Sequence, residues 1–263
     1  MKHKINKITA IIITKNEEKM ITSCLKSVDW VDQILVVDTG SSDKTRELAK
    51  KEGSTVIEYT DGKNFSDYRN YAISKAKSPW VLFVDADERV TLDLKKEILK
   101  VIFSDDSKSG YAIARLNNLL GHDMKWGGWW PDYVMRLIKV DRFVKYTGEL
   151  HEQPQIKGKT GKLKSYFYHI THRSLTSMIE KTNKWSEYEA RLMFDANHPK
   201  MNIMRFFTGV FREFWYRAIL KLGFLDGPIG IIEIVFQMFS RFVSYSKLWE
   251  LQIENNKNES SNS

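Results

Sequence analysis

The sequence predicts an α/β fold with a mostly parallel central sheet flanked by helices, followed by a C-terminal amphipathic helical segment. Three observations support this prediction. Within the first hundred residues, four apolar strand segments alternate with four helical segments. The strand segments include unbroken apolar runs, which are typical of strands buried on both faces. Polar motifs directly follow three of these strands, at the edge where parallel sheets bind ligands.

The first half of the chain is expected to alternate strands and helices in order. Residues 7–14 are rich in β-branched side chains, and residues 34–37 form a continuous apolar run. Gly53 is expected to end a helix, because glycine is favoured just after a helix. Further strands are expected at 55–59 and 80–84, and helices at 16–27, 44–52, 65–77 and 91–103.

The second half is less regular and sets the predicted domain boundaries. Strands are expected at 111–116, 133–140 and 163–170, an aromatic loop at 126–132, and helices at 177–194, 202–222 and 229–251. We therefore predict a catalytic domain over 5–175, a helical segment facing acceptor and membrane over 176–253, and a polar, disordered tail over 254–263.

Composition narrows the class of partner and the compartment. The net charge of +8 indicates an anionic partner, which charge alone leaves open among nucleic acid, a phosphate-bearing substrate and a membrane surface. Cys24 is the single cysteine, which suits a reducing compartment. Residues 10–13 are too short for the apolar core of a signal peptide. No run of about 18 apolar residues occurs, so no ordinary spanning helix is expected.

Asp85-Ala86-Asp87 is the first motif that indicates chemistry. It follows the predicted strand 80–84, which places two carboxylates at the edge of the sheet. Hard oxygen ligands suit Mg²⁺ or Mn²⁺, which can bridge a diphosphate and neutralise the charge of a departing group. The alternative is a solvated turn that caps the next helix.

Two further polar positions belong to the same layer. Asp38 ends the second strand, where it would contact a nucleobase and ribose or simply form an Asx-turn with the residues that follow. Arg69 would bind a base or a phosphate, or be a solvated helical arginine. Thr14, Asn16 and Glu17 follow the first strand and are predicted to face the same ligand.

Several segments together resemble glycosyltransferase family two. The resemblance extends over residues 7–251 and implies a Rossmann-like, glycosyltransferase A-type fold. The closing segments are similar to bacterial lipopolysaccharide core β-1,4-glucosyltransferases. The segments are ITAIIITKNEE, ILVVDTGSSDKT, FSDYRNYAISKAKSPWVLFVDADE, MRLIKVDRFVKYTGELHEQP, FLDGPIGI and YSKLWEL.

The resemblance implies roles by position. Asp38 corresponds to the acid at the nucleobase, Arg69 to the basic residue near the uracil, Asp85 to the acid near ribose and metal, and Asp87 to the main metal ligand. The family places a catalytic base further along the chain. This sequence departs from the usual Glu-Asp motif, and Glu152 is predicted to be the base.

The remaining site predictions concern the alternative base, a metal ligand and a sugar platform. Asp132 is the second candidate for the base. Among His151, His169 and His172, we favour His169 as a further metal ligand, because it comes just after Tyr166-Phe167-Tyr168 near the end of a predicted strand. The tryptophans at 126, 129 and 130 would stack on sugar rings or pack in the core. The implied reaction is a single displacement that inverts the anomeric centre.

The C-terminal third predicts the acceptor's location. Residues 200–222 combine many aromatic side chains with basic ones, which suits anionic headgroups and an in-plane anchor. The alternative is packing against the catalytic domain or a second copy, so an oligomer stays open. We predict a UDP-sugar donor, with UDP-glucose first, and a lipid-linked glycan acceptor such as the lipopolysaccharide inner core. The protein would be cytoplasmic and peripheral on the inner membrane.

Three other functions compete with this interpretation. A nucleotidyltransferase would carry a glycine-rich loop after the first strand, whereas residues 14–18 contain no glycine. A non-enzymatic nucleic-acid or membrane-binding protein would leave Asp38, Arg69 and Asp87 without a joint explanation, and no nucleic-acid module is recognisable. A transferase acting on another surface polysaccharide or lipid would keep the same mechanism with a different acceptor.

Overall fold

The computed structural model describes residues 7–148 and 152–261 and divides into two compact units. The first comprises the chain up to Leu116 together with Asp132–His169, and the second comprises Asn117–Pro131 with the chain from Ile170 onward. The catalytic domain was predicted to run over 5–175, whereas the first unit ends at His169 and does not include residues 117–131. Those residues pack with the C-terminal helices and belong to the second unit.

Four parallel strands form the first half of the central sheet, in the spatial order β3-β2-β1-β4. The apolar runs that predicted β1, β2 and β4 are buried almost throughout, whereas β3 is partly exposed. In the register of the sheet, Thr14 at the end of β1 pairs with Asp38 at the end of β2, so the two polar ends lie side by side. The strands are β1 (Ile8–Thr14), β2 (Gln33–Asp38), β3 (Thr55–Glu58) and β4 (Trp80–Phe83).

The rest of the sheet continues as β8-β6-β11-β5 and is largely antiparallel. The central sheet is therefore mixed, with its parallel half carrying the polar motifs. Beside it lies an antiparallel hairpin of β9 and β10. These strands are β5 (Glu88–Val90), β6 (Gly110–Leu119), β7 (His122–Asp123), β8 (Asp132–Lys139), β9 (Phe143–Thr147), β10 (Gln153–Ile156) and β11 (Thr160–His172).

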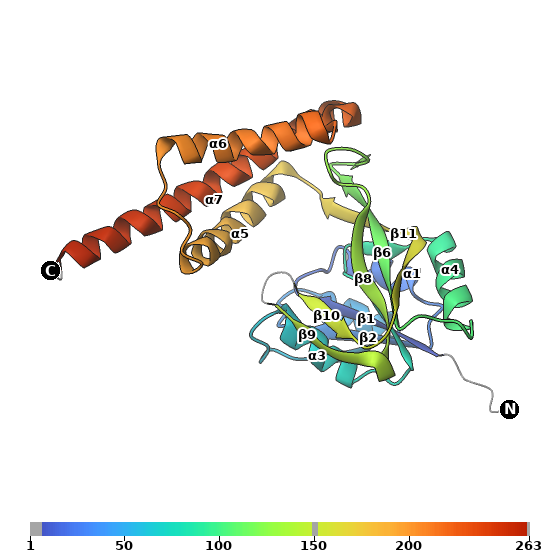
Figure 1. Ribbon diagram of the computed structural model, residues 1–263. Coiled ribbons are helices and arrows are strands. Elements are labelled where there is room, and N and C mark those ends of the chain that lie inside the picture. Colours follow the sequence, from blue (N-terminus) through green and yellow to red (C-terminus); the bar gives the residue numbers. More distant parts are fainter. Residues whose placement is uncertain (1–6, 149–151, 262–263) are drawn as a thin grey trace. The chain divides into compact units, whose positions relative to one another are not determined.

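Helices cover both faces of the parallel strands, as the alternating pattern predicts (Figure 1). One face of β1, with Ile8 and Ile12, packs against helices α1, α2 and α4. The other face, with Ile11, packs against α3 and the β9 strand. The helices are α1 (Ile21–Ser27), α2 (Thr45–Lys51), α3 (Phe65–Ser74) and α4 (Leu92–Ile102).

The helix predicted over 16–27 begins only at Ile21. Asn16 has a φ of 56°, a left-handed conformation that a helix does not contain. Its side-chain Oδ1 accepts a hydrogen bond from Ser42 N at 2.8 Å. Apolar spacing predicted the helix correctly from residue 21, but local bonds hold the preceding residues in a turn.

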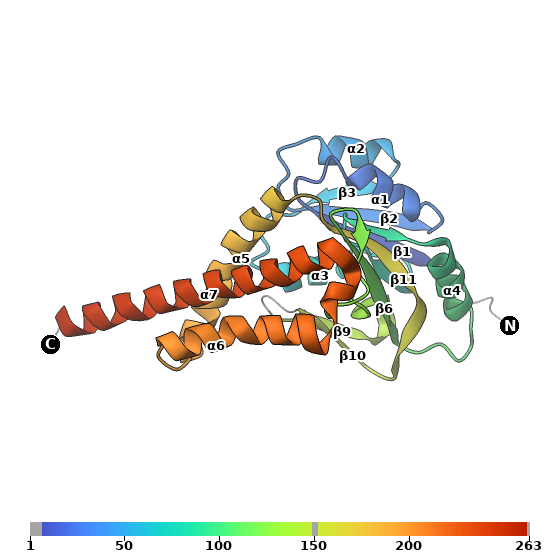
Figure 2. The same ribbon diagram turned by 90° about the horizontal axis from the view of Figure 1, so that it is seen from above.

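Helices dominate the second unit. In Figures 1 and 2, α6 lies beside α7, and the two are joined by a π-helical turn (Trp215–Leu220) and a 3-10 turn (Gly223–Asp226). Arg241 of α7 binds Glu189 of α5 at 2.8 Å and Glu213 of α6 at 3.1 Å, which links the three helices. They are α5 (Leu175–Asp195), α6 (Ile203–Phe214) and α7 (Gly227–Ser261). Residues 254–261 continue α7 instead of forming the predicted disordered tail.

One helical stretch among the described residues, Gly223–Lys257, is long and apolar enough to cross a membrane by length and composition alone. The sequence was expected to contain no spanning helix, because no run of about 18 apolar residues occurs in it. A third of its most apolar window is buried inside the structure, and α7 packs on both α5 and α6.

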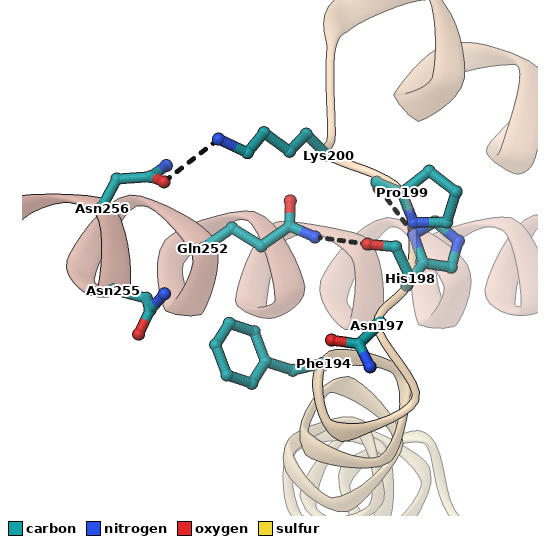
Figure 3. Close-up of a pocket in the computed structure, with 8 residues that line it drawn as sticks. All are labelled: Phe194, Asn197, His198, Pro199, Lys200, Gln252, Asn255 and Asn256. Atoms are coloured by element: carbon teal, nitrogen blue, oxygen red, sulfur yellow. Dashed lines mark hydrogen bonds between the residues drawn. The ribbon is translucent and has the colours of Figure 1, made fainter. Parts of the chain in front are cut away.

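A polar pocket of about 430 Å³ lies between the end of α5, the link to α6 and the end of α7 (Figure 3). Gln252 organises it: its Nε2 donates to His198 O at 3.1 Å and its Oε1 accepts from Met201 N at 2.7 Å. Its described lining contains amide side chains, one lysine and one histidine.

Glu233 is buried on α7 and is expected to make stability depend on pH. Burial raises the pKa of its carboxyl from 4.5 to about 7, although the Gln237 amide and the Arg217 guanidinium favour the charged form. The folded protein therefore binds this proton more tightly than the unfolded chain. This contribution to stability is complete below about pH 4.5 and falls by up to about 3 kcal/mol as the pH rises to about 7.

The Glu233→Gln variant is expected to lose this part of the pH dependence and to be more stable than the parent at about pH 8. Urea unfolding of both proteins at about pH 5 and about pH 8 measures the difference. Glu187→Gln, at an exposed position on α5, is the matched control. If the free energy of unfolding of Glu233→Gln changed with pH as much as that of the parent protein, the raised pKa would be contradicted.

Candidate active site

Two loops at the carboxyl ends of β1 and β2 are bound to each other. Asn16 N donates to Ser41 Oγ at 2.9 Å, and Glu17 N donates to Thr45 Oγ1 at 2.8 Å. The predicted residues after the first strand therefore shape the loop through their main chain. Thr14 is 3% exposed, and its buried hydroxyl has no hydrogen-bond partner within the described chain.

Asp38 is fully buried and forms the Asx-turn that was one of its two interpretations. Its Oδ1 accepts from Ser41 N at 2.9 Å and Gly40 N at 3.2 Å, and its Oδ2 accepts from Ser41 Oγ at 2.5 Å. Arg46 Nε lies 3.9 Å away. The carboxylate is thus held rigidly at the end of β2, and its nucleobase role stays a prediction.

Asp85 lies just beyond β4, against the guanidinium of Arg136 from β8. Arg136 donates through both terminal nitrogens to the two carboxylate oxygens of Asp85, in the bidentate geometry that favours specific recognition. The same guanidinium donates to Glu88 Oε1 at 2.9 Å, and Glu88 Oε2 accepts from Asp85 N at 2.9 Å. One buried arginine therefore organises the whole Asp85–Glu88 turn.

The pKa values of the two acids of this turn are shifted in opposite directions. Burial by itself would raise the pKa of Asp85, but the Arg136 and Arg69 guanidinium groups outweigh it and hold that pKa well below its usual range. The pKa of Glu88 is raised, first by burial and then by the nearby charge of Asp85. Asp85 is thus held as an anion, and its carboxylate can accept a hydrogen bond from a hydroxyl or an amide N–H of a ligand.

Arg69 joins Asp85 to the predicted base. It is 7% exposed, so it is not a solvated helical arginine. Its Nε donates to Glu152 Oε1 at 3.0 Å, and its Nη2 lies 3.5 Å from Asp85 Oδ1. The guanidinium lies over the rings of Phe83 and Tyr146, with 4.9 and 5.5 Å to their centroids. Glu152 therefore belongs to the site in space.

Asp132, the alternative base, is paired elsewhere. Its Oδ2 accepts from Arg115 at 2.6 and 2.8 Å, across the β6–β8 pair. Arg115 also lies 3.8 Å from Glu88 Oε1, so this pair belongs to the same charge network. The residues Glu149, Leu150 and His151 lie outside the described chain, and with them the histidine alternative at 151.

Asp87 and His169 face each other across the β5–β11 pair. His169 Nε2 lies 3.4 Å from Asp87 Oδ2, and His169 pairs with Glu88 in the register of the strands. A carboxylate and an imidazole at this separation fit a divalent ion that keeps most of its ligands from water and phosphate. No set of three or more acids, histidines or cysteines converges within residues 7–148 and 152–261.

Sequence reasoning missed Arg136, Arg115 and Glu88. Each lies in a strand, where a sequence pattern predicts only which face of the sheet a residue occupies and not which side chain it contacts. The one available signal was an arginine inside the apolar run at 134–138, because a charged residue there needs a buried partner. That partner comes from β5, nearly fifty residues away, so only the strand pairing shows the network.

We expect Arg136→Met to destabilise the protein by about 3–5 kcal/mol, because the fully buried Glu88 loses its nearer charged partner. Adding Glu88→Gln should recover part of this loss, since no buried charge is then left unpaired. Urea unfolding of the single and double variants measures both effects. Arg142→Met, which replaces an exposed arginine, is the control. An equal loss of stability in Arg136→Met and Arg142→Met would refute the role of the network.

The chain resembles known proteins over most of its length. The model of the family described as glycosyl transferase family 2 matches residues 9–168. An uncharacterized glycosyltransferase of Rickettsia conorii is 25% identical over 94% of this chain and 92% of its own. The lipopolysaccharide core biosynthesis glycosyltransferase LpsC of Rhizobium meliloti is 24% identical, with 92% of each chain covered.

A solved structure supports the fold. Glucosyl-3-phosphoglycerate synthase from Mycobacterium tuberculosis, in complex with phosphoglyceric acid, aligns with a TM-score of 0.51 at 14% identity, over 74% of this chain and 81% of that one. The same enzyme with Mn²⁺, UDP-glucose and phosphoglyceric acid aligns with a TM-score of 0.50 over the same shares, at 14% identity. Since the family model matches more than half of the chain, and its relatives are transferases, the protein belongs to glycosyl transferase family 2 and is a glycosyltransferase.

Proposed function

We propose that the protein transfers a hexose, with glucose first, from a UDP-sugar to a lipid-linked glycan, with inversion at the anomeric carbon. The observation that carries the proposal is the meeting of Asp85, Arg69 and Glu152 at the carboxyl end of β4. A fixed anion, a guanidinium and a second carboxylate within one network suit a ligand that combines hydroxyls, phosphates and an acceptor proton.

The donor half of the site lies along β1, β2 and β4. Asp38, the Thr14 hydroxyl and Asp85 offer acceptors for the base and ribose, and Arg69 offers donors for the uracil or phosphates. Asp87 and His169 would hold Mg²⁺ or Mn²⁺. When bound, such an ion neutralises charge on the leaving diphosphate. The solved relative with Mn²⁺ and UDP-glucose supports this assignment by analogy of fold.

Glu152 supplies the acceptor half. It is partly exposed, with 18% of its side chain accessible, so an acceptor hydroxyl can approach it. Its carboxylate would take the proton of that hydroxyl as the oxygen attacks the anomeric carbon. Arg69 orients the carboxylate at 3.0 Å, which keeps one oxygen aimed while the other accepts the proton.

The acceptor is proposed to lie at the cytoplasmic face of the inner membrane, with the lipopolysaccharide inner core as first candidate. The name of the relative LpsC supports this class of acceptor. An apolar stripe along α6 supports a lipid surface: Ile203, Phe207 and Phe211 recur every four residues and are 63–69% exposed.

Calorimetric titration of the folded protein with UDP-glucose, UDP-galactose and UDP-N-acetylglucosamine, each with and without Mn²⁺, tests the proposal. We expect metal-dependent binding of one of them, with UDP-glucose the tightest. Binding of a different UDP-sugar would keep the mechanism and change the substrate. No binding of any nucleotide sugar by folded protein would overturn the proposal.

A further inference from the structure

The turn between α6 and α7 exposes an unusual amount of apolar surface. We define residues 215–225 as the hairpin tip. Asp226 is the only acid between residues 214 and 232, and it is buried, whereas Lys221 in the tip is exposed. The exposed large side chains of the tip are Trp215, Tyr216, Ile219, Leu220, Leu222, Phe224 and Leu225.

A second segment of the same unit is attached to this tip. We define residues 124–130 as the tryptophan loop. The Asp226 carboxylate, which is 5% exposed, accepts from Trp126 N at 2.8 Å and from Lys125 N at 3.1 Å to each oxygen. His122 Nε2 lies 3.4 Å from the same carboxylate. The buried acid thus binds the loop by its main chain.

Further contacts hold the loop against the tip. Gly127 N donates to Lys221 O at 2.9 Å, and Arg217 Nη1 donates to Gly127 O at 3.0 Å. The backbones approach so closely that a Cβ on Gly223 would lie 3.1 Å from Gly127 Cα. The loop and the tip therefore form one closely packed element.

This element presents aromatic rings at its surface. Trp126 is 42% exposed and Trp130 is 37% exposed, while Trp129 is half-buried and lies 5.9 Å beneath the Arg217 guanidinium. Of the three tryptophans predicted to bind sugars, two are therefore accessible. Lys125 is exposed next to Trp126.

We propose that the hairpin tip inserts into the interface of an anionic bilayer and carries the tryptophan loop to the level of the headgroups, where it contacts the first sugars of a lipid-linked acceptor. The inference rests on the proposed function only for the acceptor. Aromatic and aliphatic side chains beside lysines, with no exposed acid, are the composition of interfacial anchors.

The charge distribution favours a bilayer over a second copy of the chain. In an interface between two copies related by a two-fold axis, the same patch meets itself, and like charges that face each other repel. Here the tip has no exposed acid to pair with Lys125 and Lys221. Anionic headgroups supply that charge without a specific partner.

Co-sedimentation with vesicles tests the proposal. The full-length protein should bind vesicles of phosphatidylcholine with phosphatidylglycerol and bind phosphatidylcholine alone weakly. The triple variant Leu220→Ser, Phe224→Ser, Leu225→Ser should bind the anionic vesicles with an affinity reduced by at least about tenfold. Phe103→Ser is the matched control, because Phe103 is 63% exposed at the end of α4 and should leave binding unchanged.

Brominated phosphatidylcholine in the vesicles tests the position of the loop. It should quench part of the tryptophan fluorescence, and the Trp126→Phe variant should show less quenching. In Asp226→Ala the loop is released, so the quenched fraction should fall although the tip remains. Unchanged vesicle binding by the triple variant, or unchanged quenching in Trp126→Phe, would overturn the proposal.

Two controls separate the alternatives. If analytical ultracentrifugation shows an oligomer that the triple variant breaks, and neither protein binds vesicles, the surface is an interface between copies and the proposal fails. UDP-glucose titration of the triple variant should match the parent protein. Vesicle binding without nucleotide-sugar binding would sink the proposed function and leave the tip as a membrane anchor.

Discussion

The Asp87→Asn variant is expected to lose metal-dependent binding of UDP-glucose and to slow sugar transfer by about a thousandfold or more. Asparagine keeps the shape of the side chain but removes the charge that faces His169 at 3.4 Å. If Asp87 and His169 hold the ion as proposed, losing one of them removes half of the proposed protein ligands. Calorimetry with and without Mn²⁺ measures the binding, and release of UDP measures the transfer.

Asp93→Asn is the matched control for this variant. Asp93 is also an aspartate just after the site, at the start of α4, but its side chain is 83% exposed and lies 3.5 Å from Lys96 Nζ. Its replacement should leave binding and transfer within experimental error. Metal-dependent binding that persists in Asp87→Asn and disappears in Asp93→Asn would place the ion elsewhere.

Glu152→Gln is expected to lower the rate of transfer about a hundredfold to ten-thousandfold, with little change in the affinity for UDP-sugar. Glutamine still accepts the hydrogen bond from Arg69 but cannot take a proton. The loss should therefore fall on kcat, because the interaction that is removed operates only as the acceptor hydroxyl reacts. Steady-state kinetics with a delipidated acceptor glycan and calorimetry with UDP-sugar separate the two quantities.

The Asp132→Asn variant decides between the two candidate bases. Asp132 is tied to Arg115 by contacts of 2.6 and 2.8 Å, so its replacement should act mainly on stability. A large fall in kcat for Asp132→Asn with a small one for Glu152→Gln would reverse the assignment. Comparable losses of kcat in both would instead indicate that the charge network acts as one unit.

The parallel half of the fold could be predicted from the sequence because its signals are local. The run Ile34–Val37 is buried throughout its last three residues, and the glycine at 53 ends α2 as expected. The antiparallel half could not be predicted as well, since the direction of β8 and β5 depends on pairing with distant strands. Alternation shows that a strand exists but does not show its neighbour.

The site divides in the same way. Asp38 ends β2, and Asp85 and Asp87 lie in the turn that follows β4, so their position at the sheet edge followed from the strand pattern. Arg69 and Glu152 are 83 residues apart and meet only because α3 packs beside the β9–β10 hairpin. Arg136 lies in the middle of β8 and gave no local sign of the turn it organises.

The hydrogen bonds between Asp226 and the tryptophan loop affect which substitutions the loop can tolerate. The carboxylate binds the main-chain amides of residues 125 and 126, and any amino acid except proline offers the same groups there. The side chains of the loop can therefore be exchanged while its path is kept. A library randomised at positions 125, 126 and 130, with 226 unchanged, is the region in which we expect variants with new acceptor preferences to remain folded.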